Sequence, residues 1–173
     1  MKTETPSKRS SELLLVLERL TELHTRLLRL IHEKIEHMRA GDAERLQACA
    51  ASEEFLIKTI GEQEGLRRQL TDDLGRGWGI EPQAARRMSA RQLGDTIDDR
   101  VRADFADATD RLRDVVGKVA DVNRVATLIA QQVLHHLRCV FEAVAMPDEQ
   151  PATYSPHGRR VKRETRQLFE MMG

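Results

Sequence analysis

The sequence predicts an all-α fold: an elongated antiparallel three-helix bundle or coiled coil with one overlong C-terminal helix and a short connecting helix. Aromatic residues make up only 3% of the 173 residues and charged residues 32%, a composition typical of long helices. One apolar stripe, from Ile97 to Val144, advances in steps of mostly three and four residues, which keeps its members on one helix face. Two shorter stripes precede it, so three main helices are expected.

The first helix is expected at residues 10–39, after a polar N-terminus at residues 1–9 that we expect to be flexible. Ser10 or Ser11 can cap this helix, because a serine oxygen accepts a hydrogen bond from a free backbone N–H. The apolar stripe is broad, as expected for a helix with two neighbours. Its members are Leu13, Val16, Leu17, Leu20, Leu23, His24, Leu27, Leu30, Ile31, Ile35 and Met38.

The second helix is expected at residues 43–74, antiparallel to the first. Gly41 suits the left-handed position that ends a helix, and Asp42 can cap the next one. So short a link forces two helices to run in opposite directions. The second stripe is the weakest of the three; it comprises Leu46, Cys49, Ala50, Leu56, Ile57, Ile60, Leu66, Leu70 and Leu74.

Residues 75–79 have a G-x-G-x-G pattern, but no strand surrounds it, so a nucleotide-binding loop is not indicated. We interpret it as a turn, with Trp78 packing over the end of the bundle. Further on, Ser89 and Gln92 form a capping box, which predicts a short helix at residues 89–95. Gly94 can separate that short helix from the long one, although an unbroken helix is also possible.

The long helix is expected at residues 96–146, because Pro147 clashes with continued helix. A helix of about 50 residues spans about 70 Å, whereas each of the first two spans about 45 Å. The long helix should therefore extend past its neighbours by roughly 20 residues, about Ala126–Ala145. An uncovered stripe of this length usually marks an interaction site, unless the C-terminal tail or a second copy of the chain covers it.

The C-terminal tail, residues 147–173, is expected to be flexible and carries a short basic amphipathic segment after Gly158. Val161, Thr165, Leu168 and Met172 lie on one face of that segment, with Phe169 beside them. Such a segment is suited to fold against a partner.

Charge and hydropathy limit the class of protein. The 28 basic residues balance 28 acidic residues, which argues against a dedicated nucleic-acid binder, and the few aromatics near the basic tail leave little to stack on bases. The longest aliphatic run near the start, Leu13 to Leu17, is too short for membrane insertion or a signal sequence. We therefore expect a cytoplasmic protein, with Cys49 and Cys139 as thiols rather than a disulfide.

Catalysis is not indicated. Residues 32–37 read His-Glu-Lys-Ile-Glu-His, which matches neither the H-E-x-x-H motif nor its inverse, and leaves ordinary pairs four residues apart on a solvated face. His135 and His136 are adjacent and point in different directions, so one is expected to pack and the other to be solvated. No catalytic residue, metal ligand or cofactor is predicted.

Three segments, in their order and spacing, resemble the FlgN-type flagellar export chaperones over about residues 10–160. The first is the Leu-rich helix followed by Arg39-Ala-Gly-Asp42. The second is Asp121-Val-Asn-Arg-Val-Ala-Thr-Leu-Ile129, with Asn123 alone where the family often has two Asn. The third is Ala152-Thr-Tyr-Ser-Pro-His-Gly158.

The resemblance implies a cytoplasmic, non-enzymatic chaperone. It would bind hook–filament junction (hook-associated) proteins similar to FlgK and FlgL before type III secretion, and deliver them to the export apparatus. In the family, substrate binding maps to the C-terminal part, which agrees with the surface predicted from spacing. The expected partner-binding residues are Ile129, Val133, Leu137, Val140, Phe141, Val144, Tyr154, Val161, Leu168 and Phe169.

Two other functions are weighed against this one. A self-associating helical coiled-coil structural or adaptor protein would form a homodimer through the same stripe. An enzyme or metal protein would need bound metal, and none is expected.

Overall fold

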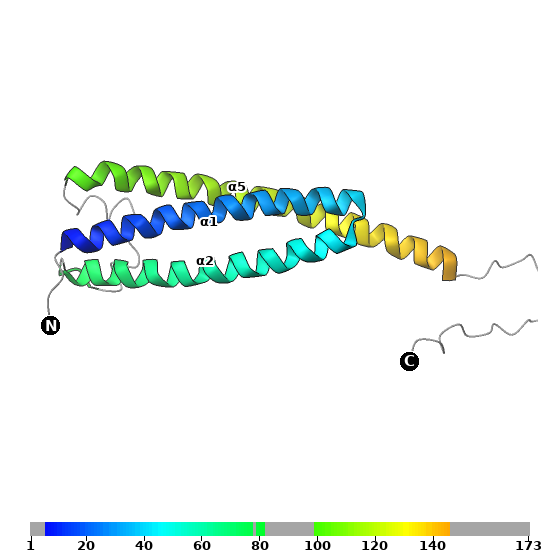
Figure 1. The fold of residues 1–173 in the computed structure, drawn as a ribbon, viewed down its shortest axis with the longest axis horizontal. Helices are drawn as coiled ribbons and strands as arrows, with labels where there is room; N and C mark the ends of the chain where they lie inside the picture. Colours follow the sequence, from blue (N-terminus) through cyan, green and yellow to red (C-terminus); the bar gives the residue numbers. More distant parts are fainter. Residues whose placement is uncertain (1–5, 78, 82–98, 146–173) are drawn as a thin grey trace, which may run out of the picture. The chain divides into compact units, whose positions relative to one another are not determined.

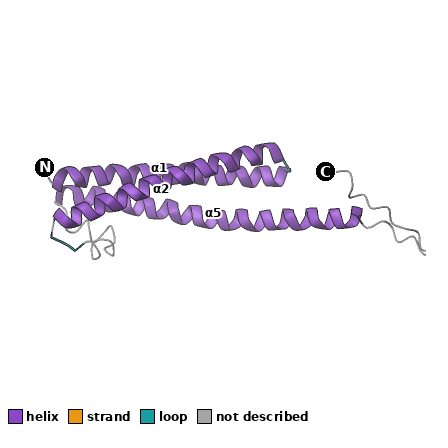
Figure 2. Ribbon diagram, turned by 90° about the horizontal axis from the view of Figure 1, so that it is seen from below, coloured by secondary structure: helices purple, strands orange, loops and turns teal. Residues whose placement is uncertain are grey.

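The structure is a computed structural model that describes residues 6–77, 79–81 and 99–145. They form three α-helices, α1 (Pro6–Ala40), α2 (Ala43–Gly77) and α5 (Asp99–Ala145), and no strand occurs within these ranges (Figures 1 and 2). The all-α prediction is confirmed. The chain divides into two units, residues 1–133 and residues 134–173, and the division falls inside α5.

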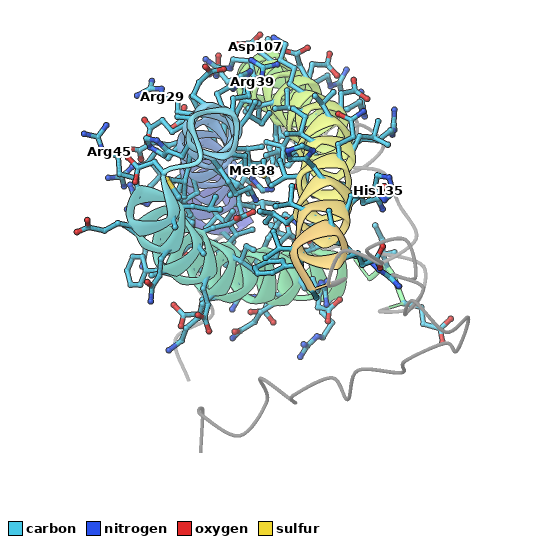
Figure 3. The ribbon with its side chains drawn as sticks, turned by 90° about the vertical axis from the view of Figure 1, so that its right-hand side faces the viewer. Arg29, Met38, Arg39, Arg45, Asp107 and His135 are labelled. Atoms are coloured by element: carbon cyan, nitrogen blue, oxygen red, sulfur yellow. The ribbon has the colours of Figure 1, made fainter. Side chains whose placement is uncertain are left out.

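In the first unit, α1, α2 and residues 99–133 of α5 lie side by side and alternate in direction (Figure 1). The backbones of α1 and α2 approach closely, whereas α5 comes near them at fewer points. The apolar faces meet between the helices, where Figure 3 shows Met38. This unit is therefore an antiparallel three-helix bundle, as expected for three amphipathic helices that bury their apolar faces against one another.

Helix α1 begins earlier than expected. It starts at Pro6, so residues 6–9, which we expected in a flexible N-terminus, are helical. Proline is favoured in the first helical turn, because its missing N–H would have no partner there. Ser10 is consequently inside the helix and buried, instead of capping its start.

Helix α2 extends to Gly77, three residues beyond the predicted end. The predicted short helix at residues 89–95, the possible break at Gly94 and residues 96–98 lie outside the described residues. The tail from residue 146 onward also lies outside them.

The turn between α1 and α2 has the predicted geometry. Gly41 adopts φ of 67°, a conformation in which a side chain would be strained. The Asp42 N–H donates to the His37 carbonyl at 3.0 Å, and the Gly41 N–H donates to the Met38 carbonyl at 3.3 Å. These two bonds are the Schellman arrangement that satisfies the last carbonyls of a helix. The Arg45 N–H in turn donates to Asp42 Oδ1 at 3.0 Å, so Asp42 caps α2 as predicted.

The glycine-rich residues at the C-terminal end of α2 form the same kind of helix cap. Gly79 adopts φ of 70°, and its N–H donates to the Arg76 carbonyl at 3.2 Å. The Ile80 N–H donates to the Gly75 carbonyl at 2.8 Å. The G-x-G-x-G pattern thus ends a helix, as expected of a turn. Trp78, which we expected to pack over the bundle end, lies outside the described residues.

Two apolar clusters form the core of the bundle. Nearly all of the predicted α1 stripe is buried, which confirms its helical phase. The first cluster consists of Leu13, Val16, Leu17, Leu20, Leu70, Leu74, Phe105 and Ala108. The second cluster consists of Leu27, Ile31, Ile35, Met38 and Ala126.

Helix α2 buries a narrower face than its sequence suggested. Ile57 and Leu66, which we placed on the buried stripe, are exposed. The sequence offered two adjoining apolar residues at several turns of α2, and adjoining residues point about 100° apart around a helix. The bundle buries Cys49 and leaves Ala50 exposed.

Polar contacts join α1 to α2 near both ends of the pair. Lys34 Nζ lies 2.5 Å from Glu53 Oε2, and both side chains are largely buried. Arg9 Nη1 donates to the Asp73 carbonyl at 3.4 Å and lies 3.9 Å from its carboxylate. These contacts cross between helices that are far apart in the sequence, so they favour one register of the pair.

Candidate partner-binding surface

The apolar stripe of α5 is covered from Phe105 to Ala130. Phe105, Ala108, Val115 and Ala126 are buried. Between and beyond them, further members are half-buried against the second cluster: Val119, Val122, Ile129 and Ala130. This part of α5 supplies one side of the bundle core.

The α5 residues of the second unit are in a different environment. Every residue from Leu134 to Ala145 is exposed. Five of these twelve residues are large and apolar: Leu134 66%, Leu137 46%, Val140 45%, Phe141 70% and Val144 80% exposed. They follow one another at three, three, one and three residues, so they lie along one side of the helix, and we call them the terminal stripe.

The uncovered stripe begins later than predicted. We expected it from Ala126, but Ala126 is only 3% exposed. The reason is the length of the covering helices, because α1 and α2 have 35 residues each, more than expected. Val133, the thirty-fifth residue of α5, is half-buried, and full exposure starts at the next residue.

The predicted partner-binding residues therefore fall into three groups. Ile129 packs against the second core cluster, and Val133 is half-buried. Leu137, Val140, Phe141 and Val144 are exposed together on α5. The remaining four lie outside the described residues: Tyr154, Val161, Leu168 and Phe169.

Leu134 belongs to the terminal stripe, and the sequence analysis missed it. Its spacing contained the signal, because Leu134, Leu137, Phe141 and Val144 follow one another at three, four and three residues. We had continued the stripe through Val133 instead, which fits the covered part of the helix.

The polar residues of this segment pair along the helix. Arg138 Nε donates to Glu142 Oε1 at 2.9 Å, four residues away. Cys139 Sγ lies 3.7 Å from His135 Nε2. His135 and His136 are both exposed, so the expectation that one of them packs is wrong. The physical reason is that nothing described covers either side of the helix at this position.

In the segment 32–37, the side chains of His32 and Glu36 make contacts within α1. His32 Nδ1 lies 2.8 Å from the Leu28 carbonyl, so this ring nitrogen donates to its own helix. Glu36 pairs with Arg39 rather than with His32. Within the described part of the chain, no group of three His, Cys, Asp or Glu side chains could hold a metal ion. Nor is any described helix long and apolar enough to span a membrane.

Comparison with models of known protein families gives a match. A family model described as FlgN protein matches residues 1–162. Searches of curated proteins and of solved structures returned no match. The matched region includes all three helices and the terminal stripe.

Proposed function

This chain belongs to the FlgN family of flagellar export chaperones, and from that premise we propose that it binds an amphipathic helix of its client on the terminal stripe of α5. The observation that carries the proposal is the exposure of five large apolar side chains within twelve residues. A contiguous apolar surface on a helix is the usual receptor for the apolar face of another helix.

Membership of the family implies that the clients are flagellar proteins. Among these, we propose the hook-associated proteins of the hook–filament junction, similar to FlgK and FlgL. The chaperone would hold a helical end of such a client and deliver it to the export apparatus. FlgN is a chaperone family that is not known for enzymatic activity. Binding without chemical conversion is therefore the activity we propose.

The terminal stripe alone gives modest affinity. Burying five partly exposed apolar side chains contributes roughly 1–2 kcal/mol each. Association costs about 4–15 kcal/mol in lost freedom of motion, which offsets most of that gain. We propose that the tail adds the missing contacts through Tyr154, Val161, Leu168 and Phe169, and that its basic residues favour a client with acidic residues beside its apolar face.

Two single aspartate substitutions test the terminal stripe. We expect Leu137→Asp and Val140→Asp each to weaken binding of a purified hook-associated protein by about thirtyfold or more, because a carboxylate would be buried without a partner. Isothermal titration calorimetry measures the affinity, and circular dichroism checks that helicity is retained.

The matched control is Val125→Asp. Val125 is 47% exposed and Val140 is 45% exposed, and both lie on α5, but Val125 lies off the stripe. Its substitution should leave client affinity within about threefold. Unchanged binding by both stripe variants would contradict the proposal, and so would an equal loss in the control.

Light scattering separates client binding from self-association. A concentration-independent dimer that Leu137→Asp converts to monomers would favour a coiled-coil adaptor that uses the same stripe. A monomeric wild type that binds its client one-to-one would favour the chaperone.

A further inference from the structure

A second surface lies on the bundle, between α1 and α2. It is an open groove of about 580 Å³, whose apolar middle is formed by Leu30, Leu56 and Phe55. The Phe55 ring is 69% exposed. The residues that line the groove come from α1 and α2, and none of them belongs to the described part of α5. The groove therefore opens on a part of the helix pair that α5 does not line.

Two arginines of α1, Arg26 and Arg29, line this groove. Neither Arg26 nor Arg29 has an ion pair or hydrogen bond with any described residue, and Figure 3 shows Arg29 directed outward from α1. The other described lysines and arginines of α1 all have partners: Lys8 with Glu12, Arg9 with Asp73, Arg19 with Glu22, Lys34 with Glu53 and Arg39 with Glu36. The two cationic side chains of α1 that have no partner among the described residues therefore both lie at the groove.

The charged residues are arranged asymmetrically along the groove. Arg26 and Arg29 lie on one side of Leu30 in the α1 sequence, and Glu33 lies on the other. The carboxylate of Glu33 is unpaired as well, since it forms no ion pair with a described residue. An occupant is therefore favoured if it places carboxylates toward the two arginines. The small side chains of Ala51 and Ser52 leave room beside Phe55.

We propose that this groove binds an acidic amphipathic helix of a partner protein. Its aliphatic face would pack on Phe55, Leu30 and Leu56, and its carboxylates would pair with Arg26 and Arg29. A helix suits the site because two antiparallel helices form a groove along their axes, and a third helix packs there as α5 does on the other face. Phe and Arg are both enriched in protein–protein interfaces relative to the rest of the protein surface. The site shares no residue with the terminal stripe.

The probe is a synthetic 18-residue peptide with leucines at positions i, i+3, i+4 and i+7, flanked by glutamates. Its counterpart has lysine in place of each glutamate. We expect the acidic peptide to bind the full chain more tightly than the basic one, and to bind less tightly as salt increases. Fluorescence anisotropy measures affinity, and amide shifts in nuclear magnetic resonance spectra locate the site, which should include residues 26–33 and 51–56.

Substitutions then assign the contacts. Phe55→Ser and the double variant Arg26→Glu/Arg29→Glu should each weaken the acidic peptide at least about tenfold. Both change exposed side chains, so the fold should remain, as thermal unfolding can verify.

The matched controls are Ile57→Ser and Arg68→Glu. Ile57 is exposed on α2 outside the groove, and Arg68 is an exposed arginine without a partner among the described residues. Both should bind the peptide within about twofold of the wild type. Equal affinity for the two peptides, no binding, or loss of binding only in Leu137→Asp would each overturn the proposal.

Discussion

Residues 105–130 and residues 134–145 of α5 carry the same kind of apolar stripe within one continuous helix, but only the first is covered. In the first segment the stripe is buried against α1 and α2 and contributes to folding. In the second, large apolar side chains remain in water, where they add nothing to the stability of the bundle. Helical periodicity therefore identifies an apolar face, while its role as core or as binding surface depends on the neighbours.

The two phenylalanines of this helix provide the strongest test of that difference. Phe105 is 1% exposed and Phe141 is 70% exposed. Phe105→Ala should lower the free energy of unfolding by about 3–5 kcal/mol, because it removes a buried ring and leaves a cavity. Phe141→Ala should change it by less than about 0.5 kcal/mol. Urea unfolding followed by circular dichroism at 222 nm measures both, and similar losses would mean that Phe141 is covered.

The reactivities of the two cysteine thiols compare burial at α2 and α5 without any substitution. Cys49 is buried on α2 and Cys139 is exposed on α5. Burial raises the pKa of the Cys49 thiol, and the nearby Glu33 carboxylate raises it further. The thiolate is the reactive form, so a raised pKa slows the reaction of Cys49. A buried thiol must also become exposed by local unfolding before a reagent can reach it. We therefore expect Cys49 to react with a thiol reagent at pH 8 about a hundredfold more slowly than Cys139, a ratio that corresponds to roughly 2.8 kcal/mol.

The single variants Cys49→Ser and Cys139→Ser assign the two reaction phases. Under denaturing urea both thiols should react at similar rates. Comparable rates in the folded protein would show that α2 does not protect Cys49.

The smallest expected effect concerns helix propensity in the covered part of α5. Gly117 is exposed, and a Cβ placed on it would meet no atom within 4 Å. Gly117→Ala should therefore raise the free energy of unfolding by about 0.5–1 kcal/mol. Client affinity should stay unchanged, because the stripe is untouched. A stabilised variant with altered client affinity would indicate that the two segments of α5 are energetically coupled.

The sequence alone determined the helical class, the phase of the α1 and α5 stripes, and the turn at Gly41 and Asp42. These features are local, because a left-handed glycine, a capping carboxylate and a spacing of three and four residues act within a few residues of the chain. The start of α1 at Pro6 is equally local, but we gave the serines more weight than the proline.

Tertiary structure decided which apolar residues are covered. It selected Cys49 over Ala50, left Phe55 and Ile57 exposed, and set the limit of cover on α5 at Val133. The sequence thus identified four of the exposed apolar residues of the terminal stripe, while the start of the exposed segment was misplaced and Leu134 was missed. Burial depends on the length and register of neighbouring helices, which a single helix does not encode in its own periodicity. The unpaired arginines beside Phe55 emerged for the same reason, since only packing brings α1 and α2 together around them.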